Sequence, residues 1–150
     1  MEEIRTYILN FGFSLLGYFI AFIIALYIVK VTAPFYIYQG GLSVAPLWVN
    51  CILWANLILT IIILFFLGTK LKLLENLWLN YLSAFSITAF LLLICYVIPY
   101  LGLVVTWPFP KLANLIYHLV NHNIYITFSI LAFLPSIIIW LGMLFQAKRS

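Results

Sequence analysis

The chain has 150 residues, of which 67% are hydrophobic and only 7% are charged, whereas soluble domains average about 45–50% apolar and about 25% charged residues. This composition excludes a water-soluble enzyme, a nucleic-acid-binding domain and an intrinsically disordered chain. It also excludes a disulfide-stapled secreted module, because two cysteines form at most one bridge. The main solvent of this chain is therefore lipid.

Four stretches reach the length of about 20 mostly apolar residues that an α-helix needs to cross a bilayer. They cover residues 7–29, 47–67, 79–103 and 124–145. The apolar runs do not alternate with polar residues, which argues against a transmembrane β-barrel. The predicted fold is an all-α integral membrane four-helix bundle that forms a single polytopic domain over residues 1–150.

The positions of the cations predict the orientation of the four spans. An even number of crossings places both chain ends and the loop around residues 68–78 on one side of the membrane. That side carries Arg5, Lys70, Lys72, Lys148 and Arg149, whereas the other side carries only Lys30 and Lys111. We therefore expect both termini in the cytoplasm, in a plasma membrane of the bacterial inner-membrane type.

The segment after the third span predicts a short amphipathic helix. The sequence WPFP at 107–110 breaks the third span, and residues 111–122 then follow a 3.6-residue period. The apolar face holds Leu112, Leu115, Ile116, Leu119 and Val120, and the polar face holds Lys111, Asn114, His118, Asn121 and His122. We expect this helix to lie flat in the outer interface, with Trp107, His118 and His122 as candidate interface residues.

Small and polar residues recur at helical spacing within the spans. The first span carries a doubled small-x-x-x-small pattern, which allows close approach of helix backbones. Polar side chains are costly in lipid, so these residues should face inward or face another protein. The candidates are Asn10, Ser14, Gly17, Ala21, Ala25, Asn50, Asn56, Thr60, Asn80, Thr88, Ser129 and Ser136. Two interpretations fit them: helix packing through interhelical hydrogen bonds, and a polar path or lipid-headgroup groove.

The spans lack the residues on which most membrane chemistry depends. The chain contains no Asp, and no span buries an ionisable residue in its central portion, which argues against proton relays, cation coupling and intramembrane aspartyl proteolysis. His118 and His122 are spaced to share a metal, but two ligands alone do not make a site. Cys51 and Cys95 form no C-x-x-C motif, and we expect two apolar thiols rather than a disulfide. The expectation is no catalytic site, no cofactor, no metal and no enzymatic activity.

The sequence thus favours a small non-catalytic multi-pass membrane protein that acts by helix–helix association. It would be an accessory subunit of a membrane transport, secretion or envelope-assembly complex. The expected partners are the lipid bilayer and another membrane protein or a second copy of the chain, and no nucleic acid. Two alternatives stay open, a small transporter or flippase for a lipid-linked or neutral solute and a membrane immunity protein.

The transporter alternative has a counterpart in a known family. Four helices with both termini inside and a basic C-terminal tail resemble the organisation of the GtrA-like family, and segment 55–73, ANLILTIIILFFLGTKLKL, is similar to that family's second helix. The resemblance implies movement of polyprenyl-phosphate-linked sugars, whose phosphate would meet the inner cations Lys70, Lys72, Lys148 and Arg149. Gly68-Thr69 replaces the family's characteristic Asn before the basic pair, and the family's N-terminal glycine–asparagine pattern is not matched.

Overall fold

A computed structural model describes residues 2–35, 45–74, 77–97 and 103–148, and the regular structure in these ranges is entirely helical. The four long helices are α1 (Glu2–Thr32), α2 (Leu47–Gly68), α3 (Leu77–Val97) and α6 (Ile124–Ala147). The short elements are η1 (Ala33–Phe35), α4 (Leu103–Thr106) and α5 (Pro110–Leu119). The four long helices are long and apolar enough to cross a membrane, which confirms the prediction of an all-helical chain with four long apolar helices.

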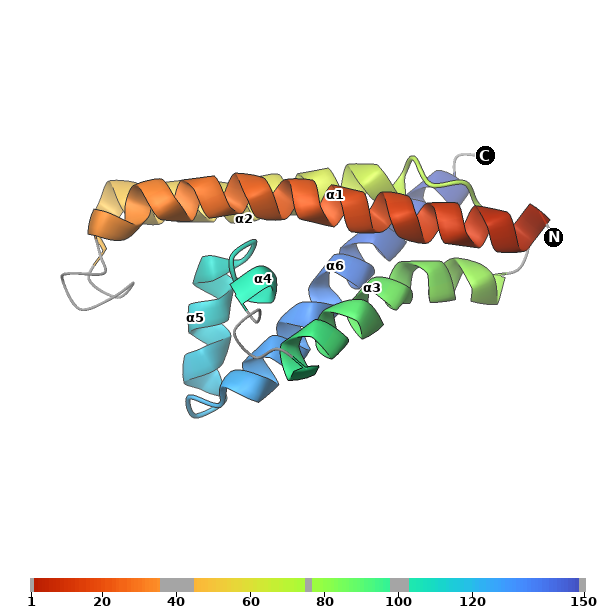
Figure 1. Ribbon diagram of the computed structural model, residues 1–150. Helices are drawn as coiled ribbons and strands as arrows, with labels where there is room; N and C mark the ends of the chain where they lie inside the picture. The colour runs from red at the N-terminus through yellow and green to blue at the C-terminus, as the bar shows by residue number, and fades with distance from the viewer. Residues whose placement is uncertain (1, 36–44, 75–76, 98–102, 149–150) are drawn as a thin grey trace.

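The long helices form two pairs that meet at one end and diverge toward the other (Figure 1). α1 packs along α2, and α3 packs along α6, while α4 and α5 lie between the pairs where they diverge. A polar contact joins the second pair, because the hydroxyls of Thr88 and Ser136 lie 2.6 Å apart. Thr88 also donates to the Ala132 carbonyl at 3.1 Å. These bonds satisfy polar groups that lipid cannot satisfy.

The two pairs are joined where α2 crosses α6 at Gly68 and Gly142. A Cβ atom on Gly68 would overlap the carbonyl oxygen of Ile139, and one on Gly142 would overlap the carbonyl oxygen of Phe65. Backbones approach this closely only where both residues lack a side chain. The end of the molecule at which the pairs meet is therefore fixed by backbone contact.

The predicted stripe on α1 faces the interior of its own chain. Its members are all buried: Asn10, Ser14, Gly17, Ala21 and Ala25. Gly17 lies against the side chain of Leu67, and Asn10 Nδ2 donates to the Lys72 carbonyl at 2.8 Å. Because these residues are buried within the chain, they are not accessible to a second copy of it.

The amphipathic helix ends earlier than its pattern predicts, whereas residues 98–102 of the third predicted span lie outside the described residues. α3 is described as far as Val97. The amphipathic helix is observed as α5, which ends at Leu119 rather than at residue 122. The cause is a reversal of the chain: Asn121 and His122 adopt left-handed φ angles of 53° and 63°.

The apolar face of α5 is partly buried by the chain and partly exposed. Ala113 and Ile116 are buried, whereas Leu115 and Leu119 are 50% and 72% exposed. The predicted apolar face is therefore only partly covered by the rest of the chain. Asn123 then starts α6 by accepting bonds from the first backbone amides of that helix, which is the role of an N-cap.

Candidate functional site

The strongest candidate site is the segment 103–110, called here the inserted segment, which lies between the two helix pairs. The carbonyl of Pro108 accepts hydrogen bonds from Thr60 Oγ1 at 3.3 Å and from Asn56 Nδ2 at 3.5 Å. At about 1.5 Å per residue, the two donors lie about 14 and 20 Å from the first residue of α2, near its middle. Irregular backbone at membrane depth is stable only where protein buries it or where it lines a water-filled cavity.

Asn56 anchors this segment without being fully satisfied itself. Its side chain is 1% exposed, and its Oδ1 atom has no hydrogen-bond partner. A buried acceptor in this state costs about 1–3 kcal/mol. The position is therefore suited to a donor such as a water molecule or a ligand hydroxyl. The Ser14 hydroxyl on α1 is likewise buried without a partner.

Trp107 connects the inserted segment to α1. Its ring stacks on Phe22 with a centroid distance of 5.9 Å and an interplanar angle of 13°. Trp107 therefore lies level with Phe22, about 15 Å along the helix from Thr32, and its place at the outer interface stays a prediction. The aromatic side chain thus lies alongside α1, well before the end of that helix.

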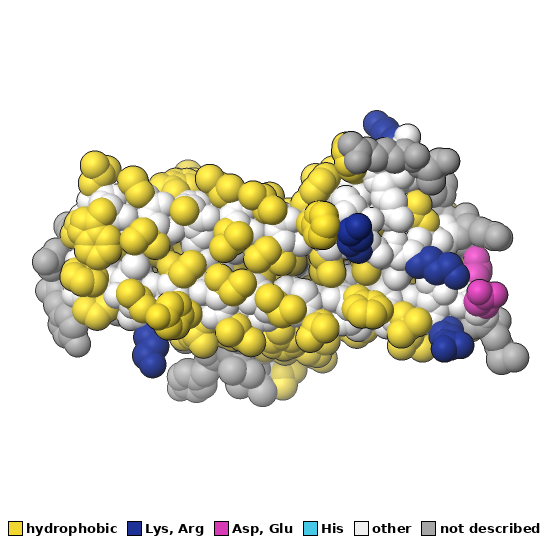
Figure 2. Space-filling view, turned by 90° about the horizontal axis from the view of Figure 1, so that it is seen from above, with side chains coloured by type: hydrophobic (Ala, Val, Ile, Leu, Met, Phe, Trp, Pro, Cys, Tyr) yellow, Lys and Arg dark blue, Asp and Glu magenta, His cyan; other side chains and the backbone are white. Residues whose placement is uncertain are grey.

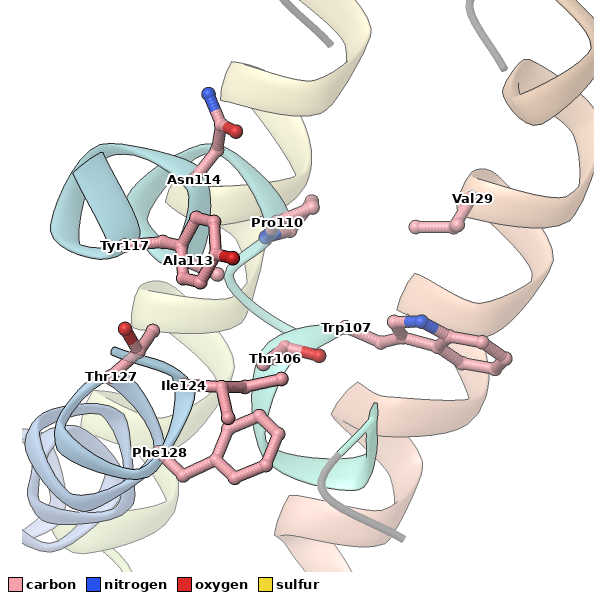
Figure 3. A pocket seen from close by; sticks show the side chains of 10 residues that line it. All are labelled: Val29, Thr106, Trp107, Pro110, Ala113, Asn114, Tyr117, Ile124, Thr127 and Phe128. Carbon is pink, nitrogen blue, oxygen red and sulfur yellow. The ribbon is translucent and has the colours of Figure 1, made fainter. Parts of the chain in front are cut away.

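A cavity of about 330 Å³ opens beside Trp107, between α1, the inserted segment, α5 and the start of α6 (Figure 3). Its apolar surface comes from Val29, Trp107, Pro110, Ala113, Ile124 and Phe128. Its polar groups come from Thr106, Asn114, Tyr117 and Thr127. Apolar walls with a few polar groups are typical of ligand sites. Among the described residues no charged side chain lines the cavity, which suits an uncharged or apolar part of a ligand.

Asn50 joins α2 to α5 at the end where the pairs diverge. Its Nδ2 donates to the Ala45 carbonyl at 2.8 Å, and its Oδ1 accepts from Lys111 Nζ. Partial burial lowers the pKa of Lys111, because burial disfavours the charged ammonium. The contact holds α5 across the gap between the helix pairs.

The remaining polar candidates take part in local packing. Asn80 accepts from the Leu74 amide at 2.8 Å and donates to the Leu74 carbonyl at 2.7 Å, which fastens the connection before α3. Ser129 lies 3.0 Å from the Tyr96 hydroxyl. Ser129 thus bonds to a neighbouring helix, whereas Asn80 bonds to the connection before its own helix.

The two histidines, which are both exposed, form an aromatic cluster with the half-buried Tyr117. The centroids of the His118 and His122 rings lie 4.9 Å apart, and the ring planes are nearly perpendicular. His122 makes this contact from outside α5, because that helix ends at Leu119. Within the described ranges, no group of three or more His, Cys, Asp or Glu residues is placed to hold a metal ion. Cys51 is exposed and Cys95 is buried, and both are free thiols.

Comparisons with protein-family models, curated proteins and solved structures find no match for this chain. The similarity of segment 55–73 to the GtrA-like family therefore stays a resemblance of organisation.

Proposed function

We propose that the protein is a small non-catalytic multi-pass membrane protein that takes up a lipid-linked or neutral solute between its two helix pairs. The observation that carries this proposal is the inserted segment, whose backbone bonds to the middle of α2 through Asn56 and Thr60. Interrupted helices near mid-membrane are the usual sites of substrate binding in transporters. Neutral polar groups without an intramembrane acid fit an uncharged solute better than ion coupling.

The cavity beside Trp107 provides the test. Val29→Trp should fill it, whereas Ile23→Trp, at a position on α1 that is 60% exposed, adds the same side chain outside it. We expect a diazirine-labelled short polyprenol in proteoliposomes to label the inserted segment and α5 of the wild-type protein. Val29→Trp should reduce that labelling by about fivefold or more, since filling an occupied site costs about 1 kcal/mol or more.

Labelling confined to lipid-facing positions would contradict this function. Equal labelling of the Val29→Trp and Ile23→Trp proteins would contradict it too, because the cavity would then play no part. An excess of unlabelled polyprenol should compete with the probe at the cavity.

A second candidate function is that of an accessory subunit of a membrane complex. It is favoured by the uncovered leucines of α5, Leu115 and Leu119, and by the low burial of α1. Only 28% of the most apolar part of α1 is buried inside the chain, against 44% for α6. Purification in mild detergent should then retain a companion chain or a second copy, and a lone 17.3 kDa particle would count against this candidate.

We propose that both termini lie in the cytoplasm and that the membrane is a plasma membrane of the bacterial inner-membrane type. The proposal is supported by the excess of cations at the end of the molecule where Arg5, Lys70 and Lys72 lie. A C-terminal green fluorescent protein fusion should be fluorescent and a C-terminal alkaline phosphatase fusion inactive. The opposite pair of results would invert the proposed topology.

A further inference from the structure

A second pocket lies at the other end of α1, where the first turns of that helix meet the connection after α2. Its volume is about 440 Å³. Four of the side chains that line it are charged: Glu2, Arg5, Lys70 and Lys72. Figure 2 shows the acidic side chains and most of the visible Lys and Arg side chains toward one end of the molecule, while the rest of that face is largely hydrophobic.

The structure fixes the wall of this pocket that carries the two lysines. Asn10 Nδ2 donates to the backbone carbonyl of Lys72 at 2.8 Å, and Asn10 is itself buried. Lys70 Nζ lies 5.2 Å from the centroid of the Phe66 ring, within the range of a cation–π contact. The two lysines therefore belong to a connection that is hydrogen-bonded to α1. The backbone of this pocket wall is held in place by that bond.

The charge of the pocket is positive, because three cations face one carboxylate, a net of 3 − 1 = +2. Glu2 lies 3.7 Å from Lys72, but the two side chains are 87% and 69% exposed. An exposed ion pair of this kind is weak and is screened by salt, so it leaves Lys72 available to an anion.

Polarity in the pocket changes along α1. Arg5 lies near the start of the helix, and Leu9 and Phe13, which line the pocket together with Leu67, follow one turn and two turns later. A cationic mouth that continues into an apolar wall matches a molecule with a phosphate at one end and an acyl chain behind it. Basic pockets beside membrane helices bind anionic lipid headgroups in this way, and Arg adds two-point recognition of phosphate.

We propose that this pocket binds the phosphate headgroup of an anionic phospholipid, with the acyl chain lying along Leu9, Phe13 and Leu67. The pocket lies at the opposite end of α1 from Trp107 and shares no lining residue with the cavity there. A failure of the lipid-binding proposal at this site would therefore leave the proposal of solute uptake between the helix pairs unaffected, and the reverse also holds.

The test uses the full-length protein in dodecyl maltoside micelles and follows its thermal unfolding midpoint during lipid titration. The probes are dioleoyl phosphatidylglycerol, dioleoyl phosphatidylcholine and inorganic phosphate. The pocket variant Lys70→Gln/Lys72→Gln is matched by Lys30→Gln/Lys148→Gln, which removes the same charge at positions that do not line the pocket. Phosphatidylglycerol should raise the midpoint of the wild-type and control proteins, and its affinity for the pocket variant should fall about tenfold or more.

Equal effects of phosphatidylglycerol and phosphatidylcholine would overturn the proposal, because the lipid charge would then be irrelevant. An equal loss of affinity in the control variant would overturn it by showing a general charge effect. Displacement of the lipid by an equal concentration of inorganic phosphate would assign the pocket to a soluble anion instead. Circular dichroism checks folding, and Arg5→Gln, which leaves the connection after α2 unchanged, supplies a second pocket variant with the same expected loss.

Discussion

Gly142→Ala should lower the free energy of unfolding by about 1–3 kcal/mol, as expected when a side chain is forced into a packed contact. The added Cβ would overlap the carbonyl oxygen of Phe65, and α2 would have to move away from α6. Gly68→Ala should have a similar effect, because its Cβ would overlap the Ile139 carbonyl. Titration of the purified protein from dodecyl maltoside into sodium dodecyl sulfate, followed by circular dichroism, measures both changes.

The matched control is Gly12→Ala on α1, where an added Cβ has no neighbour within 4 Å. This variant should be neutral or more stable, since glycine within a helix costs about 0.5–1 kcal/mol relative to alanine. The Gly68→Ala/Gly142→Ala double variant should lose less than the sum of the single losses, because one separation of the helices relieves both overlaps. Equal losses at Gly12 and Gly142 would contradict a role for the crossing.

The second large effect is expected from removing both donors to the Pro108 carbonyl. Asn56→Leu or Thr60→Val alone leaves the other donor in place, so each should cost less than about 1 kcal/mol. The double variant leaves a buried carbonyl without a donor and should cost about 1–3 kcal/mol beyond the sum of the single losses.

Hydrogen exchange locates this second effect. The amides of the inserted segment should exchange faster in the double variant, while those of the α2–α6 crossing should not change. Ser86→Ala is the control, because the Ser86 hydroxyl donates only within its own helix, to the carbonyls of Leu82 and Ser83. Strict additivity of Asn56→Leu and Thr60→Val would show that the two side chains do not share the Pro108 carbonyl.

The sequence was sufficient to predict the helical membrane class and the buried side of α1. Hydropathy alone identifies four long spans, since lipid requires about 20 apolar residues for each crossing. The stripe that includes Asn10, Ser14 and Gly17 follows from helical spacing, and the structure buries it. Both features belong to single helices, and the spacing of apolar and polar residues along a sequence predicts such features well.

The contacts between distant parts of the chain could not be predicted in this way. Gly68 ends one helix and Gly142 lies five residues before the end of another, and nothing in either span shows that the two meet. The sequence does show that WPFP interrupts a helix, but hydropathy cannot distinguish a loop at the surface from a segment inserted beside Asn56 and Thr60. That distinction depends on the donors that α2 supplies to Pro108.

The glycine crossing has a mechanical consequence for the two helix pairs. Gly68 is the last residue of α2, so the first residue of that helix, Leu47, lies about 32 Å away at 1.5 Å per residue. A small change in the angle of the crossing would therefore cause a large displacement at the other end of α2. A rotation of about 5° at Gly68 and Gly142 would displace the far end of α2 by about 3 Å, a lever-arm estimate built on the helix rise. The bond between Asn50 and Lys111 lies near that far end, where such a displacement is largest.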